Sequence, residues 1–315
     1  MKILIIKLSS FGDIIHALPV LTNLKKAFPQ SQISWLISEK FKDLIEKHNC
    51  IDKIYTVLPK NEKFDYILDL QGLIKTGFIS YILNKKINIG LVPARERLAE
   101  IFYKQKIYTS AILDPNVHII KRNLKILKAF NLEEKDFELS SPKAFWGEEL
   151  EVLKKEYIIC SPESRWESKT WVYWQEFLVK LNEYINKNNK LEILIVGNSN
   201  FTENLKLENL TKVKNLSGKT SLKDLKNIIR KASLVIGSDS GIIHLATSFG
   251  IKTLALHGAT SPFRTGPWQG EYLFLNLNCS PCHKRKCPLK LENKLKCLKE
   301  ISVDNLFSKT LELLN

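Results

Sequence analysis

One stretch, residues 233–264, limits more than any other what this chain can fold into. Residues 233–237 form a short apolar run bounded by turn residues, which predicts a buried strand. Apolar residues then recur at helical spacing up to Phe249, so the strand should pass into a helix through Ser238–Gly241. The unpaired N–H groups and the dipole at such a helix start favour an anion or a phosphate.

A second loop of small residues, His257–Pro262, follows the next predicted strand, residues 253–256. In a parallel sheet both loops reach the carboxyl edge, which is where ligands of open α/β sheets bind. Two alternatives remain open for this stretch. Asp239 or Ser240 could simply cap the helix, and His244 could be a hydrogen-bonded core histidine.

The rest of the chain alternates between strand-like and helix-like segments, which predicts two doubly wound α/β domains, residues 1–150 and 151–315. The polar segment 131–156 is the expected boundary, and the helical run 302–314 could pack on either domain. The other predicted strands are residues 2–8, 32–37, 51–57, 64–70 and 87–92 in the first half, and 157–160, 191–197 and 272–277 in the second.

Charge and the N-terminus restrict partners and location. Lys and Arg number 48 against 33 Asp and Glu, a net charge of +15. This excess favours polyanionic partners such as a membrane surface, a phosphorylated substrate or nucleic acid, but no nucleic-acid motif accompanies it. A lysine-rich surface without a polyanionic partner is the alternative. The N-terminal apolar run is too short for a signal peptide or a membrane span, which predicts a cytoplasmic protein.

Polar residues also follow strands of the first domain. The first strand opens onto Ser9–Asp13, where a carboxylate at the carboxyl edge could act as a general base or could cap the helix. Pro19 should kink or restart that helix. Asp69 and Gln71 end another strand, and burial of Asp69 would be costly without a partner.

Residues 94–97 are predicted to begin a helix that carries apolar side chains up to Tyr103. Arg95 and Arg97 at its start could hold a carboxylate or phosphate through their planar guanidinium groups. The alternative is a solvated helix start with internal ion pairs.

Four segments in order, KLSSFGDIIHALPVL, DLQGLIK, ARERLAEIFYKQK and GSDSGIIHLATSFG with HGATSP, resemble the lipopolysaccharide heptosyltransferases, glycosyltransferase family nine. The third segment resembles heptosyltransferase I most closely. The resemblance implies a GT-B fold, with an N-terminal acceptor domain facing a C-terminal nucleotide-sugar domain across a cleft. It also implies inverting transfer of heptose from ADP-heptose to the Kdo region of lipid A, with no metal required for catalysis.

The same resemblance assigns roles to individual residues. It implies Asp13 as the general base. Gln71, Lys75, Arg95 and Arg97 are the candidate acceptor residues, supplemented by Lys104 and Lys106. The implied donor-binding residues are Ser10, Ser164, Lys169, Asn215, Asp239, Ser240, Gly241 and His244. Asn215 stands where heptosyltransferase I has a glutamate for the ribose, so this contact departs from the family pattern.

Two further departures concern the acceptor and the cysteines. The chain lacks the arginine-rich insert that heptosyltransferase I has after the third strand, so the acceptor could differ in phosphorylation. Cys279, Cys282, Cys287 and Cys297 are separated by two, four and nine residues. Such a group is compatible with a structural zinc site, with an iron–sulfur cluster, or with free or disulfide-bonded thiols.

The expected partners are ADP-heptose, Kdo-lipid A and the anionic inner face of the inner membrane, where the protein would bind peripherally. Three alternatives remain. The chain could be a family member of the heptosyltransferase II type that uses another heptose or nucleotide-sugar step, or a non-catalytic basic module that binds RNA or a membrane. A nicotinamide-dependent oxidoreductase would need a Gly-x-Gly-x-x-Gly turn, and Ser9–Asp13 supplies one glycine.

Overall fold

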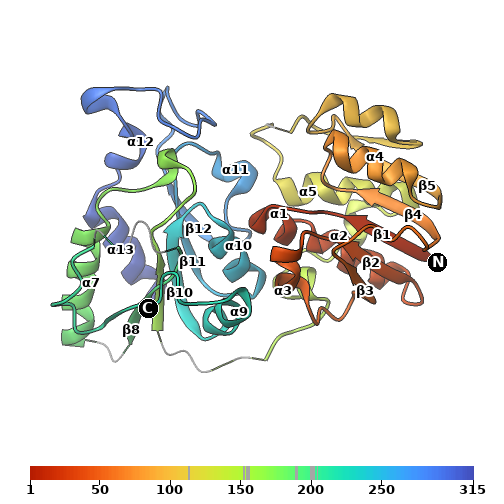
Figure 1. Cartoon of the computed structure of the whole chain (residues 1–315). Coiled ribbons are helices and arrows are strands. Elements are labelled where there is room, and N and C mark those ends of the chain that lie inside the picture. The colour runs from red at the N-terminus through yellow and green to blue at the C-terminus, as the bar shows by residue number, and fades with distance from the viewer. Residues whose placement is uncertain (113, 152, 154–156, 189–190, 199–202, 204) are drawn as a thin grey trace. The chain divides into compact units, whose positions relative to one another are not determined.

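The computed structural model describes residues 1–112, 114–151, 153, 157–188, 191–198, 203 and 205–315. The chain divides into two compact units, residues 1–150 and 151–315 (Figure 1). Part of the predicted boundary segment, residues 152 and 154–156, lies outside the described residues. Each unit contains one six-stranded parallel sheet, which confirms the predicted fold class of two Rossmann-like α/β units.

The sheet of the first unit has the strand order β3-β2-β1-β4-β5-β6. The apolar strand β1 lies in the middle, where Ile5 is paired with Trp35 on one side and Leu68 on the other. A strand buried on both faces needs an unbroken apolar run, and β1 has one. The strands are β1 (Lys2–Ile6), β2 (Gln32–Leu36), β3 (Lys53–Tyr55), β4 (Phe64–Asp69), β5 (Lys85–Val92) and β6 (Gln105–Tyr108).

Helices connect the strands of this unit. As predicted, the helical pattern breaks around Pro19: one helix ends at Ile15, and the next begins at Leu18 with proline in its first turn, where no backbone N–H is needed. The helices are α1 (Phe11–Ile15), α2 (Leu18–Ala27), α3 (Lys42–Ile45), α4 (Ile74–Ile82), α5 (Ile119–Leu124) and α6 (Lys143–Trp146).

The second unit repeats this plan with the strand order β12-β11-β10-β7-β8-β9. Its central strand β10 is paired with β11 and β7, so that Ile236 lies between Leu254 and Cys160. The strands are β7 (Tyr157–Ser161), β8 (Glu192–Ile195), β9 (Val213–Asn215), β10 (Ala232–Ser238), β11 (Thr253–His257) and β12 (Glu271–Phe274).

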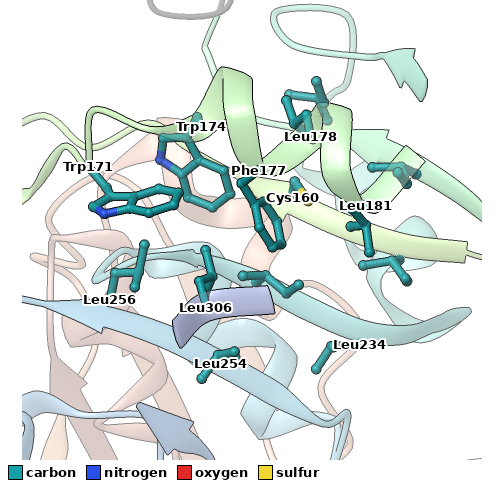
Figure 2. Close-up of a cluster of buried hydrophobic side chains, with 14 of the residues drawn as sticks. Cys160, Trp171, Trp174, Phe177, Leu178, Leu181, Leu234, Leu254, Leu256 and Leu306 are labelled. Carbon is teal, nitrogen blue, oxygen red and sulfur yellow. The ribbon is translucent and has the colours of Figure 1, made fainter. Parts of the chain in front are cut away.

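The core of the second unit lies between this sheet and its helices. Figure 2 shows the aromatic rings of Trp171, Trp174 and Phe177 above Leu256 and Leu306. Leu306 belongs to the last helix, and the Trp171 indole N–H donates to the Ile301 carbonyl just before it, so the C-terminal helix packs on the second unit. The helices are α7 (Trp174–Asn188), α9 (Leu222–Arg230), α10 (Gly241–Ser248), α11 (Pro262–Thr265), α12 (Lys296–Lys299) and α13 (Val303–Leu314).

Three predictions of local structure were wrong or incomplete. Strands β6 and β9 were not predicted; each is an edge strand with few buried side chains, so its sequence has no apolar run. The helix predicted from residue 94 to Tyr103 is instead a 3-10 helix, Arg97–Phe102, in which Leu98 and Ile101 face solvent. Strands β3 and β12 are shorter than predicted.

Candidate functional site

A buried polar cluster lies at the carboxyl edge of the second sheet, centred on Asp239. Asp239 directly follows β10, and three side chains from neighbouring segments reach its carboxylate. Lys169 Nζ lies 2.7 Å from Oδ2, the Thr260 hydroxyl donates to the same oxygen over 2.5 Å, and His244 Nε2 lies 3.4 Å from Oδ1. The structure therefore brings together Lys169, Asp239 and His244, which the sequence predicted separately.

The cluster favours an ionised Asp239. Burial alone would raise the pKa of this carboxyl, but the Lys169 charge and the two histidines hold the pKa well below its usual range. His257 Nδ1 lies 4.0 Å from Oδ2, and burial lowers the pKa of this histidine to about 4, which keeps its ring neutral near pH 7. A buried ion pair with its hydrogen bonds satisfied fixes the position of the lysine ammonium.

Lys169 is held in place by the segment that carries the cysteines. It ends the 3-10 helix Glu167–Lys169, and its ammonium lies 4.6 Å from the centre of the Trp166 ring. Ser168 donates through its hydroxyl to the Lys284 carbonyl and through its N–H to the Arg285 carbonyl. Residues 280–285 thus brace the loop that presents Lys169.

The same segment braces the loop that carries Thr260. The His283 N–H donates to the Ala259 carbonyl over 2.7 Å, and the Ser280 hydroxyl donates to the Gly258 carbonyl over 2.5 Å. A Cβ added to Gly258 would lie 2.9 Å from Cys297 Sγ, so this glycine allows a close approach of the cysteine segment. Both loops that contact Asp239 therefore rest on residues 280–297.

The start of α10 lies beside Asp239. Ser240 is the N-cap residue, but its side chain makes no capping bond, and its buried hydroxyl has no hydrogen-bond partner among the described residues. Asp239 does not cap the helix either, because its carboxylate is occupied by the cluster. The N–H groups that begin the helix at Gly241 and beyond have no partners within it, which is the arrangement that binds an anion.

Two predicted donor residues of the second unit, Ser164 in a loop and Asn215 at the end of a strand, make local contacts. The half-buried Ser164 accepts the Trp166 N–H through its hydroxyl over 3.4 Å. Asn215 ends β9, and its side-chain oxygen accepts the Ser217 N–H over 3.0 Å. Neither contact prevents the remaining polar atoms from binding a ligand.

In the first unit, Asp13 lies in α1, just after the loop that leaves β1. Both the N–H and the hydroxyl of Ser10 donate to Asp13 Oδ2, over 3.2 and 2.8 Å. This is a capping box, so the capping interpretation of Asp13 is correct as a local role. The carboxylate is nevertheless half-buried at the carboxyl edge, where it can also meet a ligand.

The charge of Asp13 depends on a lysine that the sequence analysis did not single out. Burial would raise the pKa of Asp13, but Lys7 and the hydrogen bonds from Ser10 hold the pKa below its usual value. Lys7 is 7% exposed, donates to the Leu70 carbonyl over 2.8 Å and has a pKa lowered by burial. The sequence does contain a signal for Lys7, because a lysine is unusual within an apolar run such as the one at the N-terminus.

Gln71 connects strand β4 to the loop that precedes Asp13. Its side-chain oxygen accepts the N–H groups of Leu8 and Ser9 over 3.1 and 3.2 Å. Next to it, Asp69 has the partners that its burial requires: the Gln71 N–H and the Tyr103 hydroxyl donate to its two oxygens. Burial raises the pKa of Asp69, and burial beside Asp69 raises that of Tyr103. Gln71 therefore has a structural use that its predicted acceptor role did not include.

The predicted basic residues of the first unit are exposed, but Lys104 directly precedes β6 and so lies at the amino end of that strand, away from this edge, and Lys106 lies within the strand. Arg95 follows β5, and its backbone nitrogen lies 3.0 Å from the position a Cβ would take on Gly72, whose φ is +68°. Its charge contributes to the low pKa of Asp13. Arg97 is paired with Glu100 at 3.6 Å, which matches the alternative of an internal ion pair, and Lys75 is exposed on α4.

The four clustered cysteines lie near one another in the second unit. Burial raises the pKa of Cys297 to about 11, with further contributions from the charges of Cys279, Cys282 and Cys287. Within the described part of the chain, however, no group of three or more His, Cys, Asp or Glu side chains is placed to hold a metal ion. The structural zinc stays a prediction, which elemental analysis of reduced protein would test.

The sequence model of glycosyltransferase family 9 (heptosyltransferase) matches residues 59–292. Lipopolysaccharide heptosyltransferase 1 of Pseudomonas aeruginosa is 26% identical over 346 residues, covering 95% of this chain and 92% of the relative. Lipooligosaccharide heptosyltransferase 2 of Campylobacter jejuni is 28% identical over 334 residues, covering 100% of this chain and 98% of the relative.

A solved structure shows the same fold. The structure of E. coli heptosyltransferase WaaC with ADP-2-deoxy-2-fluoro heptose matches with a TM-score of 0.77 at 20% identity, covering 99% of each chain. The two parallel six-stranded sheets are thus those of the GT-B fold. In the described part of the chain, no helix is both long and apolar enough to cross a membrane.

Proposed function

Because this chain belongs to glycosyltransferase family 9, the heptosyltransferases, we propose that it transfers heptose from ADP-heptose to the Kdo region of lipid A during synthesis of the lipopolysaccharide inner core. The chain is a glycosyltransferase, so a non-catalytic binding module is set aside. The observation that carries the donor assignment is the buried Lys169–Asp239 pair beside the start of α10. It supplies a fixed ammonium and free N–H groups in one place.

In this proposal the second unit binds the donor. The Lys169 ammonium has three donors and uses one on Asp239, so the others can reach the diphosphate of ADP-heptose. The N–H groups of Ser240 and Gly241 and the Ser164 hydroxyl add to this positive environment. Asp239 orients Lys169, and His244 and Asn215 face the sugar and nucleotide ends of the donor.

The first unit supplies the base and the acceptor site. Asp13 removes the proton of an acceptor hydroxyl while that oxygen forms a bond to the anomeric carbon from the face opposite the diphosphate. The bond between this carbon and the diphosphate oxygen breaks, and its electron pair leaves with ADP, which inverts the configuration. Ser10 keeps Asp13 in position and lies near the donor phosphates, and Arg95 holds an acceptor carboxylate or phosphate.

The transfer as proposed needs no metal ion. Negative charge grows on the departing diphosphate, and preorganised donors around Lys169 and the start of α10 stabilise it without reorganisation. The acceptor is lipid-anchored and anionic, which agrees with the net charge of +15 and with peripheral binding to the cytoplasmic face of the inner membrane.

The experiment that tests this function is incubation with ADP-heptose and Kdo-lipid A, with ADP release and product mass as readouts. We expect one ADP per acceptor and a mass gain of one heptose. The Campylobacter jejuni relative favours a second candidate, transfer to an acceptor that already carries a heptose. A product formed only on that acceptor would assign the second step, and absence of ADP release with both acceptors would contradict the proposal.

A further inference from the structure

Helix α4 exposes an apolar face. Ile74, Phe78, Tyr81 and Ile82 recur at the spacing of one helical face and are 40%, 48%, 59% and 49% exposed. The opposite face of the helix is buried through Thr76, Ile79 and neighbouring small residues. One face of α4 packs on the sheet, and its other face is also apolar. This second face therefore leaves hydrophobic surface without a partner in this unit.

The 3-10 helix Arg97–Phe102 extends this surface. Gly77 lets it approach α4, since a Cβ at Gly77 would lie 2.9 Å from the Ala99 carbonyl oxygen. Phe102 makes ring contacts with Phe78 and Tyr81, with centroids 5.7 and 6.1 Å apart. Beside this contact Leu98 and Ile101 are 63% and 70% exposed. The four exposed side chains of α4 and the two of the 3-10 helix together form what we call the apolar patch: Ile74, Phe78, Tyr81, Ile82, Leu98 and Ile101.

The exposed hydrophobic side chains of this protein are concentrated in the patch and not scattered over the surface. Thirteen large hydrophobic side chains are exposed in the described part of the chain, and six of them lie on these two short elements. Single exposed apolar residues are normal on a protein surface, but a contiguous group of this kind marks an interaction site.

Basic residues lie on or next to the two elements that carry the patch. Lys85 begins β5, and its ammonium lies 5.1 Å from the centre of the Tyr81 ring on α4. The other basic residues on or directly next to the two elements of the patch are Lys75, Lys86, Arg97 and Lys104. Among the acidic residues nearby, Glu100 is paired with Arg97 and Asp65 is paired with Lys86, so these four charges cancel, whereas Glu96 accepts the Ile74 N–H and keeps its negative charge. Lys75, Lys85 and Lys104 against Glu96 leave a net positive charge around the patch.

Apolar and aromatic side chains with lysines beside them match the interface of an anionic bilayer. The rings and aliphatic groups enter the boundary between headgroups and acyl chains, and the lysines meet the lipid phosphates. A second copy of this chain fits less well, because two surfaces of net positive charge would face each other.

We infer that the apolar patch on α4 and the 3-10 helix Arg97–Phe102 docks this unit on an anionic lipid bilayer. The position suits the chemistry, because α4 begins just after the Gln71–Gly72 loop that packs against Arg95 at the edge holding Asp13. This part of the inference rests on the proposed function: a lipid-anchored acceptor would be presented beside its base. Binding to lipid does not itself require that function.

The test is sedimentation of the full chain with vesicles of phosphatidylcholine containing 30% phosphatidylglycerol, and with phosphatidylcholine alone. The variant Phe78→Gln/Ile101→Gln removes two members of the patch without a change in charge. A matched control, Val172→Gln/Phe263→Gln, removes two exposed apolar side chains of the second unit. We expect the patch variant to lose at least tenfold in affinity for the anionic vesicles, the control to bind as wild type, and binding to weaken with salt.

Equal binding by the patch variant and wild type, or no binding by wild type, would overturn the inference. If light scattering shows that the wild type is a dimer and the patch variant a monomer, the patch binds a second copy of the chain instead. Transfer to a deacylated, soluble acceptor separates the two proposals. The patch variant should keep its rate on that acceptor, and a wild type that binds vesicles but transfers no heptose would contradict the proposed function alone.

Discussion

The two units each place an aspartate at the carboxyl edge of a parallel sheet, near the start of a helix, but the surroundings of the two carboxylates differ. Asp239 is 4% exposed, and a lysine, a threonine and a histidine reach its oxygens. Asp13 is half-buried, and its hydrogen bonds in the described structure come from Ser10 to one oxygen. An enclosed carboxylate such as that of Asp239 can hold other groups in place, whereas a partly open one such as that of Asp13 can exchange a proton with a substrate.

The largest expected effect concerns the ion pair of the second unit. Lys169→Ala leaves Asp239 as a buried carboxylate without its cation, which should lower the free energy of unfolding by about 3–5 kcal/mol. ADP affinity should fall as well, because the ammonium that we propose to bind the diphosphate is lost. Chemical denaturation and ADP titration measure the two effects. Lys294→Ala breaks the exposed pair with Glu167 and is the control, with little change expected in either quantity.

The second effect is a pH dependence that comes from His257. Its pKa is lowered from 6.5 to about 4, so between these values the unfolded chain binds a proton that the folded chain does not. Stability should therefore fall by about 3 kcal/mol as the pH decreases from 6.5 to 4. His257→Asn should remove this slope in urea titrations at each pH, whereas His283→Asn, at a half-buried ring, should largely keep it. An unchanged slope in His257→Asn would show that another group titrates.

The third effect separates the two arginines of the first unit. Arg95→Ala should raise the acceptor KM at least tenfold through the loss of a charge-assisted hydrogen bond, with ADP-heptose affinity unchanged. Arg97→Ala should change the same KM less than twofold, because Arg97 is already paired with Glu100. If Arg95→Ala weakens ADP binding and spares the acceptor, the two substrates have been assigned to the wrong units.

The smallest effect concerns the positioning role of Gln71. Gln71→Leu leaves the N–H groups of Leu8 and Ser9 without their acceptor, which should loosen the loop before Asp13 and lower kcat about tenfold at unchanged ADP affinity. Gln71→Glu keeps an acceptor oxygen and should restore most of the rate at neutral pH. A raised acceptor KM with normal kcat would instead support direct acceptor binding by Gln71.

The sequence predicted the buried strands well because a parallel sheet covered on both faces needs apolar runs, as in β1 and β10. It missed β6 and β9, which lie at sheet edges and contain residues such as Lys106 and Lys214. The segment from residue 94 was predicted as a helix that carries apolar side chains, but it forms the 3-10 helix Arg97–Phe102. Leu98 and Ile101 belong instead to the exposed patch.

The site shows a similar division. Lys169, Asp239 and His244 were each indicated by a strand end or by resemblance to a family, and the structure places them in contact. His257 and Thr260 lie in the loop His257–Pro262, but the sequence predicted no role for them. Only the packing of β11 beside β10 brings them to Asp239. Spacing along the chain cannot show which side chains of two loops meet.

The most direct test of the central claim compares Asp13→Asn with Asp239→Asn, measuring heptose transfer and ADP affinity for each. Asp13→Asn keeps the shape of the side chain but cannot take the proton, so its kcat should fall about a hundred- to ten-thousand-fold while ADP binds as in wild type. Asp239→Asn should weaken ADP binding, because Lys169 loses its partner. Near-normal turnover of Asp13→Asn would contradict the account.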